Sequence, residues 1–312
     1  MKISIVTTIY KSESFIDEFY ERICESIKKV NMDESCEIIF VNDGSPDNSI
    51  VKLINLSEKD SRVKIIDLSR NFGHHSAIIA GLENSIGQHV YLTDVDLEEP
   101  PEKLIDFYEC ITNKKNKNSI DVIYGIQSSR NNSGLAKYGG KFFYNFFKYM
   151  SNVSIDDNVM TMRIMTRRYV DALLLHKEKE LYLAGLFSIT GFKQKAITVE
   201  KFSRRETSYT VTKRVNLFIQ AIVSFSSVPL VIFFYLGGTI SFLTFLYSFF
   251  LVIRVLLSSY VLEGWTSLIV SIWFLSGIIL MAIGVIGIYL SKIFNEVKNR
   301  PVYIVRKIYE RK

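Results

Sequence analysis

The chain has 312 residues, enough for one large domain or two smaller ones, and 48% of them are hydrophobic. Its three cysteines, Cys24, Cys36 and Cys110, are an odd number without a Cys-x-x-Cys spacing, which agrees with a reducing compartment. The formal net charge of +6 comes with basic residues beside long apolar runs, so it predicts contact with anionic lipid headgroups and no nucleic-acid partner.

The first part of the chain alternates short apolar runs with amphipathic stretches. The runs predict strands at residues 2–9, 37–41, 63–68, 90–93 and 121–127. The stretches between them predict helices at residues 15–30, 47–58, 76–85 and 100–112, the last of which opens on two prolines. This order indicates an α/β fold with a mainly parallel sheet covered by helices on both faces. In such sheets ligands bind beyond the carboxyl ends of the strands.

The stretch Lys137–Met150 combines seven Phe and Tyr residues with three lysines. Two interpretations remain open here: a core helix, or an interfacial helix whose aromatic rings lie at headgroup depth and whose lysines contact lipid phosphates. The apolar run at the N-terminus is too short for a signal peptide, and no small-residue cleavage site follows it.

Residues 216–253 and 266–291 form two runs without a charged residue. Each is long enough to cross the hydrocarbon core of a bilayer, which needs about 20 apolar residues. The alternative is a helical hairpin buried in a soluble core, but core helices seldom stay uncharged for so long. The two runs therefore predict two transmembrane helices.

Basic residues flank these two runs. Lys213 and Arg214 precede the first and seven Lys and Arg residues follow the second, whereas the connector 258–265 carries only Glu263. By the positive-inside rule, both termini and the N-terminal domain face the cytoplasm, so a multi-pass protein of the inner membrane is predicted. The expected divisions are a catalytic domain at 1–209, an interfacial helix at 210–228, transmembrane helices at 229–257 and 266–291, and a basic cytoplasmic tail at 292–312.

The strongest candidate site lies in the run Tyr91–Pro101, where an apolar strand ends in Asp94 and Asp96. On an extended chain, residues two apart point the same way, so the two carboxylates should converge. Like charges repel unless a cation lies between them, and Mg²⁺ binds one or two carboxylates together with substrate phosphates. This segment predicts a divalent-cation site.

Two other polar turns follow predicted strands. In Asn42–Asp47, Asp43 could accept hydrogen bonds from a nucleoside, although a plain turn is the simpler interpretation. In Ser69–His75, Arg70 and the glycine turn could approach phosphates. The adjacent pair of histidines diverges on a strand or a helix, so these side chains are expected to be solvent-facing or hydrogen-bonded and not a metal pair.

In order and spacing these three segments resemble the family 2 glycosyltransferases of GT-A fold. The resemblance is closer to bacterial polyisoprenyl-phosphate (undecaprenyl-phosphate) glycosyltransferases and dolichyl-phosphate mannose synthases. Those proteins read approximately V-D-D-G-S, S-R-N-F-G and D-x-D-L-Q-D-P-P-E. The likeness continues through Arg163, Gly185, Gly191 and the two-helix tail, and it covers essentially the whole chain.

The resemblance implies a role for each matching residue. The residues implied to bind the nucleotide sugar are Thr8, Tyr10, Glu13, Asp43, Arg70 and Asp94. The ligands implied for Mg²⁺ or Mn²⁺ are Asp94, Asp96 and Glu98, the last where the family usually has glutamine. Asp96 and Arg163 would be catalytic, and the acceptor phosphate would contact Arg163, Arg204 and Arg205. The family also implies a homo-oligomer, a tetramer.

One departure concerns the catalytic base, because Thr161 stands where the family has the aspartate often proposed for that role. Either Asp156 or Asp157 substitutes, or no base is needed. We favour the second, because a phosphate monoester with a second pKa of about 6 is mostly a dianion at pH 7. A lysine of the family pattern is also lost, where Ser208 stands, which bears on the identity of the donor.

The reaction expected is inverting transfer of a hexose or N-acetylhexosamine from a UDP-sugar to undecaprenyl phosphate, for modification of a cell-surface glycan. Nicotinamide enzymes and P-loop triphosphatases are disfavoured because their glycine-rich motifs are missing. The remaining alternative is a non-catalytic membrane scaffold or a subunit of a lipid-linked sugar flippase. The two apolar helices offer no polar path across the bilayer, which argues against transport.

Overall fold

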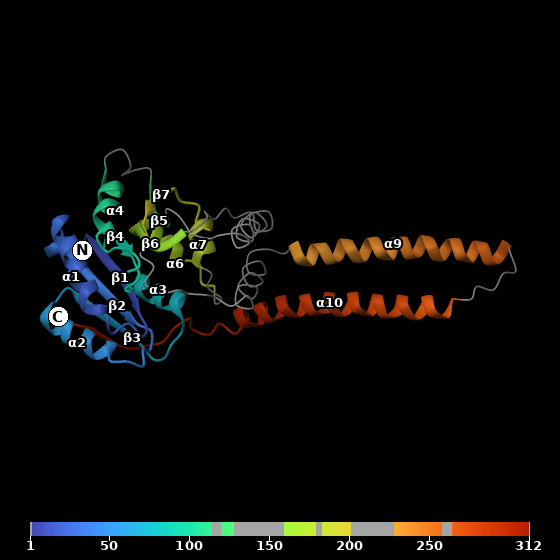
Figure 1. Cartoon of the computed structure of the whole chain (residues 1–312), viewed down its shortest axis with the longest axis horizontal. Coiled ribbons are helices and arrows are strands. Elements are labelled where there is room, and N and C mark those ends of the chain that lie inside the picture. The colour runs from blue at the N-terminus through green and yellow to red at the C-terminus, as the bar shows by residue number, and fades with distance from the viewer. Residues whose placement is uncertain are drawn as a thin grey trace. The chain divides into compact units, whose positions relative to one another are not determined.

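The computed structural model describes residues 2–113, 120–127, 159–178, 183–200, 228–257 and 264–311. The chain divides into two compact units (Figure 1). The first unit comprises residues 1–148, 152–210 and 300–312, and the second comprises residues 149–151 and 211–299.

The first unit is built on an eight-stranded sheet of order β7-β5-β6-β4-β1-β2-β3-β8. Its strands are β1 (Ile3–Ile9), β2 (Cys36–Asn42), β3 (Val63–Leu68), β4 (His89–Leu92), β5 (Val122–Gln127), β6 (Val159–Thr166), β7 (Gln194–Val199) and β8 (Val305–Glu310). Parallel pairs join β1 to β2 and β4, β2 to β3, and β5 to β7. Strands β6 and β8 run antiparallel to their neighbours. The expected α/β fold with a mainly parallel sheet is confirmed.

Helices cover both faces of the sheet. Among the described residues of the first unit, the helices are α1 (Ile16–Lys29), α2 (Ser49–Lys59), α3 (His74–Glu83), α4 (Lys103–Thr112), α6 (Arg167–Leu174) and α7 (Leu183–Ile189), with a short 3₁₀ turn at Asp33–Ser35. Alternate strand residues divide between two cores: Ile5 packs with α1, α2 and α4, whereas Val6 packs with α3, α6 and α7. This division follows the period of two along a strand, and it leaves the strand ends as the polar part of the sheet.

The C-terminal segment differs from the expected tail. Within the residues of the predicted basic tail, 292–312, α10 continues to Val297 and residues 305–310 form β8 beside β3. Strand β8 (VRKIYE) reads as polar because an edge strand carries charged side chains toward solvent. The last strand of the first unit therefore follows the apolar helices in the chain.

The second unit contains two long helices, α9 (Val228–Leu257) and α10 (Trp265–Val297). Within the described residues, the segment Ser271–Val297 is the one stretch long and apolar enough to cross a membrane, with a mean hydropathy of 2.3. None of its most apolar window is buried inside the structure, unlike a core helix. The described apolar stretch of α9, Leu230–Ile240, is shorter.

Candidate active site

The carboxyl ends of four neighbouring parallel strands meet at one edge of the sheet. They bring Thr8 from β1, Asp43 after β2, Arg70 after β3 and Asp94 after β4 to this edge. Because β6 runs antiparallel to β4 and pairs Arg163 with Leu92, the beginning of β6 lies at the same edge. The fold thus gathers most of the described candidate residues, as expected for the ligand-binding edge of an α/β sheet.

Asp43 organises the loop that follows β3. It is 2% exposed, and its Oδ1 and Oδ2 accept the backbone N–H groups of Phe72 at 2.7 Å and Gly73 at 3.0 Å. Burial raises the pKa of Asp43, and these two N–H groups act in the opposite direction. A carboxylate has about four acceptor positions, so these bonds leave capacity for a nucleoside hydroxyl or base. Contact of Asp43 with a nucleoside stays a prediction.

Gly44 allows the same loop to approach β2 closely. Its φ is +61°, and a Cβ at this position would lie 2.4 Å from the carbonyl carbon of Arg70 and 2.5 Å from the nitrogen of Asn71. Only glycine fits a backbone contact this short with a left-handed conformation. The Asn-Asp-Gly turn therefore acts as a docking element for the loop 69–73.

The segment after β1 is fixed by residues after β2. Ser45 Oγ accepts the backbone N–H of Lys11 at 2.7 Å, and Asp47 Oδ2 accepts that of Glu13 at 3.2 Å. Glu13 in turn accepts the backbone N–H of Asn48 at 3.3 Å, so its carboxylate is used in this cross-link. The side chain of Tyr10, in the same segment, is 45% exposed and so accessible to a ligand.

His74, at the start of α3, connects two of the strand ends. Its Nδ1 lies 3.1 Å from Thr8 Oγ1, and its Nε2 lies 3.6 Å from Asp94 Oδ1. The prediction that this histidine is hydrogen-bonded is confirmed. His74, which directly follows the loop 69–73, thus lies near Asp94, the first of the predicted metal ligands.

The acidic segment after β4 does not continue as an extended strand. Strand β4 ends at Leu92, residues 95–98 turn, and Leu97 has a φ of +59° although its side chain is only 1% exposed. Asp96 Oδ1 accepts the backbone N–H of Glu98 at 3.0 Å within this turn. The extended backbone expected through Asp94 and Asp96 is therefore wrong, whereas convergence of the two carboxylates stays a prediction. Among the described residues, no group of three or more His, Cys, Asp or Glu side chains is placed to hold a metal ion, and the set Asp94, Asp96 and Glu98 stays a prediction.

Glu99, which the sequence analysis did not single out, is the acid that anchors this turn. It is 3% exposed, and its Oε1 accepts the backbone N–H groups of Thr161 at 3.1 Å and Met162 at 3.3 Å. Its Oε2 lies 3.4 Å from the hydroxyl of Thr93, which donates to it. Glu99 therefore fixes the acidic turn against the beginning of β6, next to Arg163.

Arg163 is a buried cation at the same edge. It is 3% exposed, its Nε and Nη2 donate to the carbonyl groups of Thr161 and Met160 at 3.0 Å each, and its Cζ lies 3.4 Å from the ring centre of Phe187. Burial lowers the pKa of Arg163 to about 10, so the guanidinium keeps its charge at neutral pH. A buried positive charge held by carbonyl dipoles and a ring can take an anionic oxygen as a further partner.

Arg70 differs from Arg163 in its surroundings. Its side chain is exposed, stacks 4.1 Å from the ring centre of Phe72 and donates to the carbonyl of Asn71 at 3.1 Å. Arg204, Arg205, Asp156, Asp157 and the aromatic stretch 137–150 lie outside the described residues.

The mainly parallel sheet therefore carries an acidic turn and a buried arginine at its ligand edge. The chain belongs to glycosyl transferase family 2, whose family model matches residues 4–174. A putative glycosyltransferase of Mycobacterium tuberculosis is 41% identical over 309 residues, which cover 99% of this chain and 89% of the relative. The bactoprenol glucosyl transferase of Shigella phage SfII is 33% identical over 312 residues, which cover 98% of each chain.

Solved structures show a weaker likeness. A mannosyltransferase of Pyrobaculum calidifontis in complex with GDP-Man and Mn²⁺ has a TM-score of 0.47 and 13% identity, covering 66% of this chain and 58% of that one. A likeness of this size carries no argument about donor or metal.

Proposed function

We propose that this glycosyltransferase moves a hexose or N-acetylhexosamine from a UDP-sugar to undecaprenyl phosphate, with inversion at the anomeric carbon. The observation that carries the proposal is the buried, charged Arg163 beside the acidic turn Asp94–Glu99 at the ligand edge of the sheet. Full-length similarity to a protein named bactoprenol glucosyl transferase supports the lipid acceptor.

The residues present fit a divalent cation that has few protein ligands. Asp94 and Asp96 are half-buried carboxylates at a strand end, and Mg²⁺ or Mn²⁺ needs only one or two of these when a diphosphate supplies further oxygens. When bound, the ion would neutralise charge on the departing diphosphate. Asp94 Oδ1 also lies 3.6 Å from Nε2 of His74, the residue that follows the loop 69–73.

The acceptor supplies its own nucleophile in this proposal. An oxygen of the lipid phosphate forms the bond to the anomeric carbon while the bond from that carbon to the UDP oxygen breaks. At pH 7 the attacking oxygen is already deprotonated, so no side chain has to remove a proton. Arg163 would hold this phosphate beside the anionic donor, and Thr161 is left with a backbone role, since its N–H donates to Glu99.

We place the protein in the inner membrane through α9 and α10, with the catalytic domain and both termini in the cytoplasm. The apolar segment Ser271–Val297 supports one crossing. The 30 residues of α9, charged only at Arg254, support the second, because about 20 suffice to span the hydrocarbon core. A soluble sugar nucleotide and a membrane-bound lipid phosphate could then meet at the bilayer surface.

The test offers membranes that contain the protein a panel of nucleotide sugars together with undecaprenyl phosphate and Mg²⁺ or Mn²⁺. The lipid fraction is then weighed by mass spectrometry, with Asp96→Ala membranes as the control. We expect one UDP-sugar to add one sugar residue to the lipid phosphate. If the purified chain neither forms product nor binds a nucleotide sugar with metal, the scaffold alternative takes its place.

A further inference from the structure

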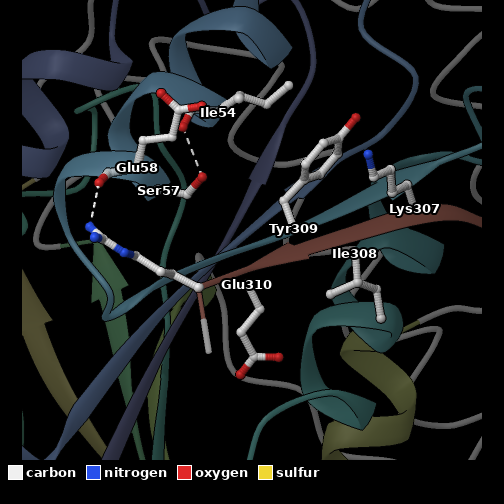
Figure 2. Close-up of a pocket in the computed structure, with 8 residues that line it drawn as sticks. Ile54, Ser57, Glu58, Lys307, Ile308, Tyr309 and Glu310 are labelled. Carbon is white, nitrogen blue, oxygen red and sulfur yellow. Dashed lines mark hydrogen bonds between the residues drawn. The ribbon is translucent and has the colours of Figure 1, made fainter.

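Strand β8 belongs to the catalytic domain, and it follows α10 in the chain after a short connecting segment. It is one of the two edge strands of the sheet. It pairs antiparallel with β3, from Lys64 opposite Glu310 to Leu68 opposite Val305. Figure 2 shows Tyr309 and Lys307 on the side of α2, and Ile308 on the other side of the strand. Tyr309 packs on the core beneath α1, α2 and α4.

A bulge interrupts this pairing at Arg306. Asp67 pairs with Lys307 and the next residue, Leu68, pairs with Val305, so Arg306 is the extra residue of β8. The extra residue returns Val305 to the side of α3, where Val305, Phe72 and Tyr303 each pack against the core under that helix. Bulges of this kind bend a strand and re-aim a side chain, often beside an active site.

The side chain of Arg306, re-aimed by the bulge, contacts the end of β3 and the loop after it. Arg306 Nη2 donates to the carbonyl of Ser69 at 2.6 Å, and its Nη1 lies 3.5 Å from Asp67 Oδ2. Asp67 is buried, with 4% of its side chain exposed, and its other oxygen accepts Nδ2 of Asn42 at 2.7 Å. Arg306 is therefore linked through Asp67 to the residue that precedes Asp43.

Two neighbouring residues hold the same region. The carbonyl of Ile304 accepts the backbone N–H of Ser69 at 2.9 Å. The hydroxyl of Tyr303 donates to the carboxylate of Glu83 at the end of α3, the helix that begins with His74. The segment 303–306, which we call the tail clamp, thus contacts both the first residue of the loop 69–73 and the helix after it.

We propose that the tail clamp positions the loop 69–73 for the nucleotide donor, with Arg306 as its principal positioning residue. This inference rests on the proposed function, which assigns Asp43 and Arg70 to the donor. Asp43 and Gly44 hold the loop from the side of β2, and the tail clamp holds it at its junction with β3. A loop fixed at only one of these places would sample more conformations and would bind the donor more weakly.

The first test measures the loop itself, by amide hydrogen exchange of the full-length protein in detergent micelles. We expect Arg306→Ala to speed exchange at residues 69–73, and Arg306→Lys to recover part of the protection. The matched control is Arg311→Ala, because Arg311 lies on the same segment and also donates to a backbone carbonyl, that of Glu58 in α2, at 2.8 Å. It should leave exchange at residues 69–73 unchanged.

The second test measures UDP binding by titration calorimetry in the presence of MnCl₂, together with initial rates. Losing a charged hydrogen bond should weaken UDP binding and raise the donor KM about tenfold in Arg306→Ala, with kcat and the acceptor KM little changed. Tyr303→Phe, which removes a single hydroxyl, should give a smaller effect of the same kind and serves if Arg306→Ala does not fold.

The two tests separate this inference from the function on which it rests. Wild-type exchange and UDP affinity in Arg306→Ala, or equal losses in Arg311→Ala, would overturn the tail clamp. If the wild-type protein binds no UDP and transfers no sugar, the proposed function fails, and the exchange data alone then decide whether Arg306 holds the loop.

Discussion

Replacing Gly44 by alanine tests whether the contact between β2 and the loop 69–73 shapes the donor site. The added Cβ would lie 2.4 Å from the carbonyl carbon of Arg70. Real Cβ atoms essentially never come within 3.0 Å of such an atom. Both partners are backbone, so no side chain can rotate away. The loop must therefore retreat, and the two N–H groups that Asp43 accepts would move with it.

The loss of folding stability expected for Gly44→Ala is the sum of two energetic penalties at this position. Forcing extra volume into a packed contact costs about 1–3 kcal/mol, and an alanine in the left-handed region costs roughly 1–2 kcal/mol more. We expect Gly44→Ala to lose about 2–5 kcal/mol of folding stability and to lower Tm by several degrees. Since a displacement of about 1 Å can cost 100-fold in rate, kcat/KM for the donor should fall about 10–100-fold.

Gly87→Ala is the matched control for this experiment. A Cβ there would lie 2.5 Å from the nitrogen of Ser4, an overlap of similar depth, but at the start of β1 and so at the opposite edge of the sheet. Gly87→Ala should lose stability and keep the donor KM. Initial rates against donor concentration, with Tm for each variant, make the comparison. A donor KM that stays normal in a folded Gly44→Ala protein, or rises equally in Gly87→Ala, would refute the reasoning.

Four other predictions concern the chemistry and the membrane. Asp96→Ala should abolish transfer with an unchanged Tm, which initial rates at saturating metal measure; near-normal turnover of this variant with metal chelated would remove Asp96 from the mechanism. Arg163→Ala should lose far more activity than Thr161→Ala, Asp156→Asn or Asp157→Asn, and a thousandfold loss in either asparagine variant would restore a general base. Because burial lowers the pKa of Arg163 to about 10, the alkaline decline in rate that comes from losing this charge should not begin until pH approaches 10. Reporter fusions at the C-terminus should be active in the cytoplasm, and a periplasmic signal would contradict the topology.

The sequence predicted the strands that are both apolar and central. Strand β3 (VKIIDL) was placed at its observed bounds, 63–68, because Val63, Ile65, Ile66 and Leu68 give it an apolar and largely β-branched pattern. Strand β6 was missed because Arg163 interrupts its apolar pattern, and β8 because an edge strand carries charges. Pairing between residues 67 and 307, far apart in the chain, leaves no local signal.

The residues of the candidate site were likewise predictable only in part. Polar residues directly after apolar strands identified Asp43, Arg70 and Asp94, because strand ends are readable from the pattern. The turn at Leu97 was not readable, since its left-handed backbone is held by burial of a side chain whose type ordinarily avoids that conformation. In the sequence, Glu99 is one of several acids in a polar run. Its role follows from hydrogen bonds to the backbone amides of β6, which have no local sequence signal.

In the proposed reaction a sugar alone, and not a sugar phosphate, passes from a UDP-sugar to a lipid phosphate. The most direct measurement is the nucleotide released per lipid-linked sugar formed by the purified protein, read by chromatography alongside the mass of the lipid product. The proposed reaction predicts one UDP for each lipid-linked sugar, a product with a single phosphate, and neither species from Asp96→Ala. Release of UMP with a product carrying two phosphates would contradict it.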